Sequence, residues 1–516
     1  MTVVTPGTIE HWAREKPDAV AIVEGDRQLT FAAWNEAADR VAASLHALGV
    51  QRGDIVVVRT QIRLEWGIVA GALGKLGCSL LAQNWRLTPA ETQYVLGNSG
   101  ATVFVCDDPD PALLKPAFEG LNIKLAVSID AAAEGFVSFA SLMEHAPTPR
   151  FSAGDPPLII YTSGTTGLPK GVVMNTREIA RTDARAAEYL QDVAASRPQM
   201  AGDVVLLTLP MHHGAGPAAL WGALRLGNRI VLLRRFDPAT TLALIDRHEV
   251  TAWTGVPTMY KRIAALPREE LDRHDVSSLR LLGVGAAPVP PALKEWIDDY
   301  FGVGKLSEGY GSTETGMITT LAPGMHRVKP GSSGLPFRHV DIRIRDDSGA
   351  DLPVGTVGEI WVRTPGTIRQ YLNGKLLDAD TLDGDGFFRV GDVGRIDEDG
   401  YLFITDRAKD MIISGGVNLY PAEIEAGLLR HPAVLDVAVI GIPDDEFGEQ
   451  VKAFVELRPG ATASTEEIVE HAKLHLASYK RPKSVEIVAE LPRNTMGKLL
   501  KRDLREPYWK GRERRV

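Results

Sequence analysis

The sequence predicts an α/β protein, with a large N-terminal domain of mostly parallel, helix-flanked sheets and a small α+β domain at its C-terminal end. Up to about Gly400, short apolar runs alternate with stretches of helical length, which is typical of parallel strands joined by crossover helices. From about Val340, strand-like runs follow one another, which indicates a small antiparallel or β-barrel-like element. A chain of 516 residues is also too long for a single compact core.

The elements of the N-terminal part are expected in alternation. Helical patterns cover residues 31–48 and 237–248. Short apolar runs bounded by turn residues predict strands. The predicted strands are 103–106, 204–207, 230–233 and 279–284, followed by 340–344 and 358–362 in the antiparallel element.

A second, smaller unit is expected after residues 406–410. We therefore divide the chain into an N-terminal domain, 1–406, and a C-terminal domain, 407–516, which is large enough to fold alone. Ser464 and Glu467 have the spacing of a capping box, which predicts a helix start at this point. The expected elements are helices at 421–430 and 464–476 and strands at 434–440, 451–457 and 484–488.

Composition excludes several classes of protein. Hydrophobic residues make up 44% and charged residues 24%, and the net charge of −9 does not favour a nucleic-acid partner. Cys78 and Cys106 lack metal-ligand spacing, so we expect buried thiols in a reducing compartment rather than a zinc site or a disulfide. The N-terminal residues show no leader pattern, and no run of 18 apolar residues occurs. We expect no integral membrane segment and a cytoplasmic location.

The most informative segment is Tyr161-Thr-Ser-Gly-Thr-Thr-Gly-Leu-Pro-Lys-Gly-Val172, which directly follows an apolar run. Its hydroxyls, glycines and lysine would bring many donors and one positive charge to a polyphosphate. It is not a Walker A loop, because Gly171 follows Lys170 where that motif has Ser or Thr. It also lacks the Gly-x-Gly-x-x-Gly of a Rossmann fold. The alternative is an ordinary turn between a strand and a helix.

A second segment, Gly309-Tyr-Gly-Ser-Thr-Glu-Thr-Gly316, places an aromatic ring between two glycines. The face of Tyr310 would be free to stack on a flat heterocycle. Thr313 offers a hydroxyl, and Glu314 offers a carboxylate suited to a hard cation such as Mg²⁺. A glycine-rich turn with an exposed acid is an equally good interpretation of this segment alone.

Three further segments have ordinary interpretations when they are read singly. Asp392 and Arg407 could hold ribose hydroxyls or form a surface salt bridge. The segment from Lys409 to Glu425 contains Gly415-Gly416 before Tyr-Pro, which could also be a hairpin turn ahead of a helix. Lys498, which follows Asn-x-x-Gly, could enter a cleft or be a solvated charge.

Taken together, the order and content of these segments resemble the acyl- and aryl-CoA synthetases of the adenylate-forming superfamily. That superfamily includes firefly luciferases and the adenylation domains of peptide synthetases. The resemblance extends from about Thr8 to Arg505. It implies an enzyme that uses ATP, Mg²⁺, coenzyme A and a small carboxylic acid, with a mobile C-terminal domain that turns about a hinge near Lys409.

The resemblance also implies roles for individual residues. Lys498 would act on the α-phosphate and the substrate carboxylate, Thr313 on the α-phosphate, and Glu314 on Mg²⁺. His213 would lie at the acyl pocket and near the thiol path. The nucleotide and CoA would be bound by three groups of residues: the phosphates by Thr162, Ser163, Gly164, Thr165, Thr166, Gly167 and Lys170; adenine and ribose by Gly285, Ala286, Ala287, Gly309, Tyr310, Gly311, Asp392 and Arg407; and the pantetheine arm by Gly415 and Gly416.

The sequence departs from the family pattern near the acyl pocket. His212 stands where an aromatic residue is usual, and Asn175 where a histidine is common. Glycines suggest a roomy pocket and no cation is obvious, which favours an apolar acid over a dicarboxylate such as malonate. The residues proposed for the pocket wall are His213, Gly214, Gly216, Trp253, Gly255, Gly285 and Met317.

The leading hypothesis is an ATP-dependent acid:CoA ligase of fatty acid or other lipid metabolism. Alternatives are transfer of the acyl group to a carrier-protein thiol or an amine, a luciferase-type oxidation, and a nucleotide-binding regulator without catalysis. The presence of both Glu314 and Lys498 argues against the last of these. For self-association we consider a homodimer.

Overall fold

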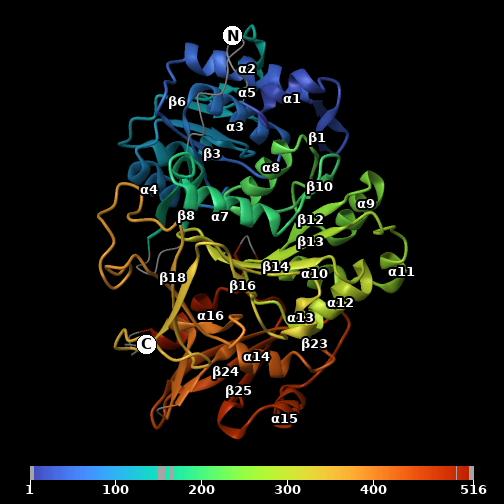
Figure 1. Cartoon of the computed structure of the whole chain (residues 1–516), viewed down its shortest axis with the longest axis vertical. Coiled ribbons are helices and arrows are strands. Elements are labelled where there is room, and N and C mark those ends of the chain that lie inside the picture. Colours follow the sequence, from blue (N-terminus) through green and yellow to red (C-terminus); the bar gives the residue numbers. More distant parts are fainter. Residues whose placement is uncertain (1–4, 149–156, 163–167, 416, 495–496, 511–516) are drawn as a thin grey trace.

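The computed structural model describes residues 5–148, 157–162, 168–415, 417–494 and 497–510 (Figure 1). Two large, mostly parallel sheets of seven and nine strands form the upper part of the molecule in this view. A four-stranded antiparallel sheet and a five-stranded sheet follow. The predicted α/β fold class, with an antiparallel element and a small α+β unit, is confirmed.

The seven-stranded sheet has the order β7-β6-β5-β3-β4-β8-β9. Its strands are parallel except β9, which runs antiparallel to β8. The predicted strand 103–106 is confirmed, and all four of its residues are buried. The strands are β3 (Ile55–Arg59), β4 (Ser79–Ala82), β5 (Val103–Cys106), β6 (Leu125–Ser128), β7 (Val137–Ser138), β8 (Leu158–Thr162) and β9 (Lys170–Met174).

The nine-stranded sheet has the order β16-β15-β14-β13-β12-β10-β11-β1-β2. Its six central strands are parallel, and antiparallel strands lie at both edges. The strands are β1 (Val20–Glu24), β2 (Arg27–Thr30), β10 (Val204–Leu207), β11 (Arg229–Leu232), β12 (Ala252–Gly255), β13 (Leu281–Gly285), β14 (Leu306–Ser312), β15 (Gly316–Leu321) and β16 (Leu335–Pro336).

Helices surround these sheets and form two hydrophobic clusters with them, a large one and a smaller one that includes α4 and the seven-stranded sheet. Helix α3 is buried along nearly its whole length and contacts both β4 of the first sheet and β1 of the second. The helices up to residue 328 are α1 (Ile9–Glu15), α2 (Phe31–Ala47), α3 (Leu64–Leu76), α4 (Pro89–Ser99), α5 (Phe139–Glu144), α6 (Thr176–Ile179), α7 (Ala184–Ala195), α8 (Ala215–Arg225), α9 (Pro238–His248), α10 (Pro257–Ala264), α11 (Arg268–Leu271), α12 (Pro291–Phe301) and α13 (Met325–Val328), with a 3₁₀ helix at Pro111–Phe118.

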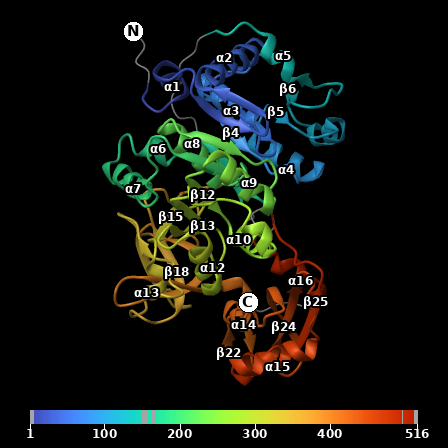
Figure 2. The ribbon, with the colours of Figure 1, turned by 90° about the vertical axis from the view of Figure 1, so that its right-hand side faces the viewer.

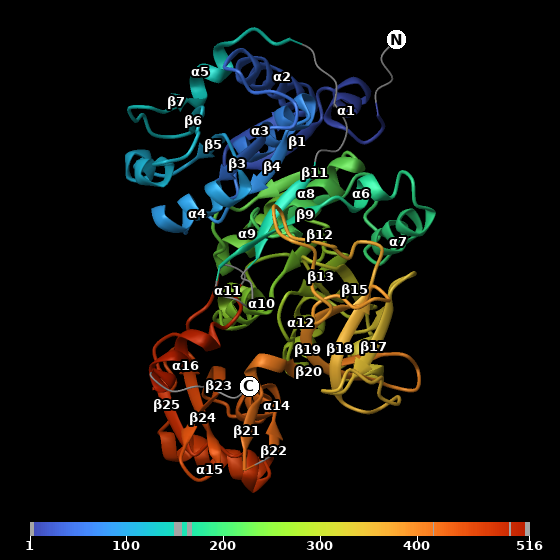
Figure 3. The same cartoon turned by 90° about the vertical axis from the view of Figure 1, so that its left-hand side faces the viewer.

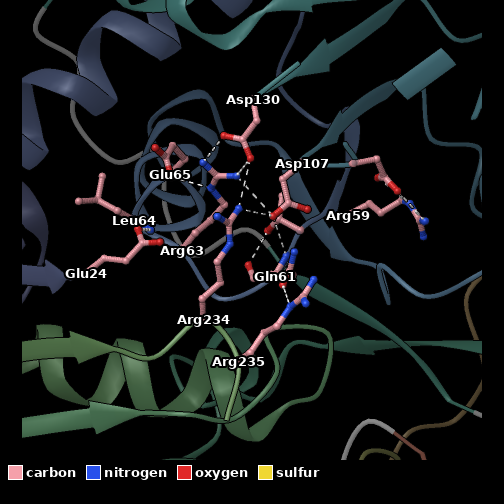
Figure 4. A network of polar contacts seen from close by, with 12 residues as sticks. Glu24, Arg59, Gln61, Arg63, Leu64, Glu65, Asp107, Asp130, Arg234 and Arg235 are labelled. Atoms are coloured by element: carbon pink, nitrogen blue, oxygen red, sulfur yellow. Dashed lines mark hydrogen bonds and ion pairs between the residues drawn. The ribbon is translucent and has the colours of Figure 1, made fainter. Parts of the chain in front are cut away.

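An ion network joins the two large sheets where their strands end (Figure 4). Arg63, which follows β3, donates to both carboxylate oxygens of Asp130 at 2.6 and 2.8 Å. Arg234, which follows β11 of the other sheet, reaches Asp107 and Asp130 at 3.2 Å each. Burial alone would raise the pKa of Glu65, but hydrogen bonds from Arg27 and Arg63 lower it to about 2. The Glu65 carboxylate of the network is therefore ionised at neutral pH.

The antiparallel four-stranded sheet has the order β17-β18-β19-β20. It packs its apolar side chains with those of α7 and β15, including Tyr189, Ile318 and Ile360. It thereby connects the nine-stranded sheet with the C-terminal part. Its strands are β17 (Asp341–Arg345), β18 (Gly358–Arg363), β19 (Phe388–Ile396) and β20 (Leu402–Arg407).

The last part of the chain forms a separate lobe with a core of its own, drawn in orange and red in Figure 2. The predicted capping box is confirmed, because Ser464 and Glu467 each accept from the other's backbone N–H. The strands are β21 (Ile412–Ser414), β22 (Val417–Leu419), β23 (Val434–Asp444), β24 (Gly448–Leu457) and β25 (Ser484–Val488); the helices are α14 (Pro421–Leu428), α15 (Thr465–His475) and α16 (Lys501–Trp509), with 3₁₀ turns at Ala408–Asp410 and Ser478–Lys480.

The C-terminal lobe touches the rest of the molecule at α10, as Figure 3 shows. The Lys261 ammonium forms an ion pair of 2.8 Å with Asp436 of β23. Arg262 pairs with Glu490 at 3.3 Å. A Cβ on Gly497 would stand 1.9 Å from the hydroxyl oxygen of Thr258, so only glycine fits at this contact. These contacts hold the loop that carries Lys498 against the N-terminal part.

Two expectations about the whole chain can be compared with the structure. Cys78 and Cys106 are buried free thiols, and burial raises their pKa values to about 11 and about 12. Among the described residues, no helix has the length and apolar character needed to cross a bilayer.

Candidate active site

The predicted phosphate loop joins two paired strands. Thr162, the last residue of β8, pairs with Lys170, the first of β9. The Thr162 hydroxyl donates to Oε1 of Glu314 at 3.1 Å. The predicted phosphate ligands between these strands, Ser163, Gly164, Thr165, Thr166 and Gly167, lie outside the described residues. The two ends of the loop and the predicted magnesium ligand are thus brought together.

Tyr371, which sequence reasoning missed, completes this corner of the site. The Lys170 ammonium lies 4.9 Å from the centre of the Tyr371 ring. Burial and the neighbouring Glu314 carboxylate raise the pKa of the Tyr371 phenol, so it stays protonated beside that carboxylate. The backbone N–H of Leu372 donates to the Gly171 carbonyl at 2.7 Å and holds the segment in place. Nothing in the residues around Tyr371 resembles a nucleotide-binding motif.

The predicted adenine slot is at the ends of β13 and β14, whose backbones are paired and lie close together there. Gly285 pairs with Gly309 in the parallel register, and a Cβ on Gly285 would stand 2.5 Å from the Gly309 carbonyl oxygen. Ala286 has a φ of +67°, a left-handed conformation that is unfavourable for alanine. Ala287 follows on the same turn. Gly311, on the other side of Tyr310, has no room for a side chain, because its Cβ would stand 2.3 Å from the Gly316 carbonyl oxygen.

The predicted ribose ligands form a connected group beside this slot. The Tyr310 hydroxyl donates to Oδ2 of Asp392 at 2.6 Å, and Nε of Arg407 lies 2.7 Å from Oδ1 of the same carboxylate. Asp392 is buried, and its neighbour Arg407 is partly exposed. Burial and the Asp392 carboxylate raise the pKa of Tyr310, so the phenol remains a donor. The salt bridge anticipated as an alternative is present, but its carboxylate is buried instead of lying on the surface.

Lys498 lies near this group of residues. Its backbone N–H donates to Oδ1 of Asn494 at 2.9 Å, which fixes the turn after β25. Burial lowers the pKa of the Lys498 ammonium to about 8, and the cations Arg407 and Lys409 lower it further, while Asp392 opposes them. The predicted catalytic lysine is therefore in electrostatic contact with the predicted ribose ligands, across the two parts of the chain.

The two histidines after β10 lie side by side, with ring centres 4.7 Å apart. His212 is buried and His213 is half-buried. Burial lowers the pKa of His213 to about 4, so its imidazole is neutral at physiological pH. Burial also lowers the pKa of His212 well below its usual value. Neither ring supplies a positive charge to the pocket.

Three of the glycines proposed for the pocket wall do not open a large space. The terminal methyl of Met174 lies 3.3 Å from the point where a Cβ on Gly214 would stand. A Cβ on Gly216 would lie 2.4 Å from the Pro210 carbonyl oxygen, so this glycine serves close packing of α8. Gly255 is covered by the rings of Trp253 and Tyr260 in the same way. At these three positions the absence of a side chain therefore serves close packing.

The predicted CoA-binding turn is a hairpin between β21 and β22. Gly415 has a φ of +58° at this turn, and its backbone N–H donates to the Phe447 carbonyl at 2.8 Å. The hairpin interpretation of this segment is therefore confirmed. Gly416 lies outside the described residues, and a role for either glycine in binding pantetheine stays a prediction.

Comparison with known proteins is consistent with these observations. The family described as AMP-binding enzyme matches residues 9–372, and the AMP-binding enzyme C-terminal domain matches residues 423–498.

Among curated relatives, the chain is 34% identical to the fatty acid–[acyl-carrier-protein] ligase ScoC of Streptomyces coeruleorubidus, over 99% of this chain and 97% of the relative. It is also 34% identical to a long-chain-fatty-acid–CoA ligase of Bacillus subtilis, over 95% of this chain and 92% of the relative.

Among solved structures, the o-succinylbenzoate coenzyme A synthetase MenE of Bacillus subtilis, in complex with ATP and magnesium ion, superposes with a TM-score of 0.80. It is 29% identical and covers 97% of this chain and 99% of that one. Family, relatives and structure agree over nearly the whole length. The chain therefore belongs to the AMP-binding enzymes and is an adenylate-forming ligase.

Proposed function

We propose that the protein is an ATP-dependent acid:CoA ligase. It would convert a largely apolar carboxylic acid and ATP into an acyl-adenylate and pyrophosphate, and then form the acyl-CoA thioester with release of AMP. The observation that carries the proposal is the position of Lys498 beside Asp392 and Arg407, which adjoin Tyr310, while Glu314, four residues after Tyr310, accepts from the Thr162 hydroxyl. Lys498 with its neighbours, and Glu314 with Thr162, would serve one reaction if a carboxylic acid and a nucleotide bound between them.

The first step has a definite electrostatic problem, because two anions must approach each other. A carboxylate oxygen attacks the α-phosphorus of ATP, a P–O bond forms, and the bond to the pyrophosphate oxygen breaks. The Lys498 ammonium would stabilise the negative charge that gathers on the α-phosphate, and the Thr313 hydroxyl would donate to it. Lys170 would hold the departing phosphates, and Asp392 with Arg407 would bind the ribose hydroxyls.

Glu314 fits a role as a magnesium ligand. Its carboxylate lies beside two neutral hydroxyl groups, Thr162 and Tyr371, and offers a hard oxygen donor. No group of three or more metal-ligating side chains occurs in the described part of the chain, so the substrate phosphates would supply other ligands. When bound, Mg²⁺ would neutralise phosphate charge.

In the second step a thiolate attacks the acyl carbonyl, and AMP leaves as the C–O bond breaks. We propose that the C-terminal domain, 407–516, turns about Lys409 against the N-terminal domain, 1–406, to expose the site to the thiol. Gly415 and Gly416 would then line the path of the pantetheine arm. The neutral imidazole of His213 would border the acyl pocket without repelling or attracting the thiolate.

The main alternative concerns the acceptor of the acyl group. One relative is a ligase that uses an acyl carrier protein, so a carrier thiol, or an amine, remains a second candidate for this chain. Both alternatives keep the adenylation step and differ only after it.

The deciding experiment measures AMP and pyrophosphate release from purified protein with Mg-ATP, with and without CoA. The acids would range from acetate to palmitate and include benzoates and a steroid side-chain acid. We expect acid-dependent AMP formation that rises sharply with CoA. Pyrophosphate release without any response to CoA would contradict the CoA ligase and favour another acceptor. ATP binding without turnover of any acid would overturn the enzyme assignment.

A further inference from the structure

An arginine that no sequence motif marks lies against the floor of the predicted acyl pocket. Arg197 follows helix α7 by two residues. Its Cζ is 3.2 Å from the point where a Cβ on Gly283 would stand, and its Nη2 is 3.0 Å from the equivalent point on Gly309. Both glycines expose backbone there, and the guanidinium occupies the space that side chains would otherwise fill.

Strand geometry shows which side of the sheet Arg197 covers. Gly283 and Gly285 are two residues apart on β13, so they face the same side, and Gly309 pairs with Gly285. This is the side that carries the predicted adenine slot. The opposite side carries Trp253, whose ring packs against Tyr260 and Phe301 at centre distances of 4.6 and 6.2 Å. Arg197 therefore faces the nucleotide and acyl side of the sheet, whereas Trp253 belongs to the core behind it.

The surroundings of Arg197 are apolar apart from hydroxyl groups. The methyl of Met317 lies 2.7 Å from the Cβ point of Gly309, beside Nη2 of Arg197. The Thr254 hydroxyl lies 2.6 Å from the Cβ point of Gly283, beside Cζ. Tyr260, which is fully buried, donates its hydroxyl to the Gly283 carbonyl at 3.0 Å. A ligand that reached this point would meet a cation and a hydroxyl at the end of an otherwise apolar space.

Unlike Arg63 and Arg407, Arg197 has no carboxylate partner in the described parts of the chain. Arg63 pairs with Asp130 and Arg407 with Asp392. Burial lowers the pKa of Arg197, and the only ionisable group that opposes this shift is Tyr260. A guanidinium nevertheless stays charged in a protein. The residue as a whole keeps partial exposure.

We propose that Arg197 determines the acid specificity of this enzyme by binding a second, anionic oxygen group at the far end of the substrate. The substrate class is a carboxylic acid with an apolar body and a distal carboxylate. A planar guanidinium matches a carboxylate through two parallel hydrogen bonds, and an unpaired cation in such surroundings is costly until an anion pairs with it. The proposal rests on the proposed ligase function and refines it. It also corrects the expectation, drawn from the sequence, that no cation borders the pocket.

The test compares matched acids on three proteins. The wild type, Arg197→Met and Arg197→Lys are assayed for pyrophosphate release with octanoate, suberate and monomethyl suberate, and with 3-phenylpropanoate against its 4-carboxy derivative. We expect the wild type to prefer the dicarboxylates. Arg197→Met should lower kcat/KM for the dicarboxylates roughly 10- to 100-fold, the range typical of a lost hydrogen bond to a charged group. The same variant should leave the monocarboxylates unchanged or improved.

The Arg197→Lys variant and monomethyl suberate separate the effect of charge at the proposed anion site from the effect of shape. Arg197→Lys should recover part of the preference, because it keeps the charge but loses the planar fork. The monomethyl ester should behave like octanoate if the distal charge is what matters. Arg185→Met, which removes an exposed arginine from α7, is the matched control and should change neither class of acid. A wild type that prefers the monocarboxylates, or an Arg197→Met variant with an unchanged preference, would overturn the proposal.

Equilibrium binding separates this proposal from the ligase function. Calorimetric titration of suberate and octanoate into each protein requires no turnover. Arg197-dependent binding of suberate without pyrophosphate release would support the anion site while refuting the ligase. Turnover of monocarboxylates with no effect of Arg197 on suberate binding would support the ligase while refuting the anion site.

Discussion

Burial and the neighbouring cations Arg407 and Lys409 all disfavour the charged form of Lys498. Removal of the ammonium should affect the step in which negative charge gathers on the α-phosphate more than the step in which a thiolate displaces AMP. We expect Lys498→Ala to slow pyrophosphate release by roughly 100- to 1,000-fold, the scale of a lost electrostatic contact to a transition state. Thioester formation from a supplied acyl-adenylate should change far less.

The matched control is Lys483→Ala, which removes an exposed lysine from the same lobe. It should leave both half-reactions at the wild-type rate. An equal loss of both half-reactions in Lys498→Ala would contradict the assignment of this lysine to the first step alone.

The pKa of Lys498, lowered to about 8, leads to a pH dependence with a definite sign. The ammonium is the form that stabilises the phosphate, and it loses its proton as the pH rises through this value. The kcat/KM for pyrophosphate release should therefore decline above about pH 8, by up to tenfold per pH unit. Lys498→Arg keeps its charge over this range, so it should be slower overall but should lack the decline. The same decline in both proteins would assign it to another group.

The site shows what a single sequence reveals at the residue scale. Tyr310 lies in a glycine-rich segment that stands out by itself, whereas Asp392 and Lys498 were singled out only because the order of the segments resembles the adenylate-forming superfamily. Arg197 was not, because an arginine after a helix usually lies in solvent. Its one signal was the spacing of Tyr189, Val193 and Arg197, which places all three on one face of α7 and its extension. The identity of its neighbours, Gly283 and Gly309, depends on strand pairing that the sequence does not state.

At the scale of secondary-structure elements, the ion network in Figure 4 links loops from both large sheets. Arg63 is almost fully buried and pairs with Glu65, Asp107 and Asp130. Its removal would leave Glu65 with Arg27, and Asp107 and Asp130 with Arg234, as their remaining counter-charges. We expect Arg63→Met to lower the free energy of unfolding by about 3–5 kcal/mol, as is usual when one partner of a buried ion pair is lost. Denaturant unfolding monitored by tryptophan fluorescence would measure this.

An exposed ion pair supplies the control for the network. Arg268 pairs with Asp272 at 2.8 Å on α11, and both side chains are more than half exposed, at 80% and 53%. Arg268→Met should change the free energy of unfolding by less than about 1 kcal/mol, because exposed pairs contribute little. A similar, small change in both variants would show that the network does not stabilise the junction of the sheets.

The secondary structure was more predictable where the local pattern alone decides it. Strand 484–488 and the capping box at Ser464 were predicted correctly, because alternation and capping are local signals. The strand predicted at 279–284 runs instead from Leu281 to Gly285, because Leu279 is still part of the preceding turn and bonds to Val276. The strand predicted at 451–457 begins earlier, at Gly448, because β23 pairs with β24 along its whole length. Such boundaries are set by tertiary pairing.

At the scale of the whole molecule, the structure shows a single orientation of the C-terminal lobe relative to the N-terminal part. Lys498 reaches the nucleotide side only because its loop contacts α10 through Gly497 and Thr258. No pattern in the sequence specifies this orientation, since the sequence of each part is compatible with several. The orientation places Lys498 beside Asp392 and Arg407, where the proposed adenylation step needs its charge. The thioester step would require the lysine to withdraw.

A reversible lock across this contact would test whether the two steps need two arrangements. Arg262 on α10 and Glu490 on the C-terminal lobe lie 3.3 Å apart, and their side chains are 54% and 70% exposed. An Arg262→Cys/Glu490→Cys variant could be bridged by a short, reducible, thiol-specific reagent. Cys78 and Cys106 are buried with raised pKa values, so they should react slowly.

We expect the bridged protein to release pyrophosphate in a single turnover at close to the unbridged rate. It should fail to form thioester from acyl-adenylate and CoA, because the lobe cannot turn, and a reductant should restore that step. Each single-cysteine variant, treated in the same way, should perform both steps. Thioester formation by the bridged protein at the unbridged rate would show that one arrangement serves both reactions, and the hinge proposed at Lys409 would then have no role in catalysis.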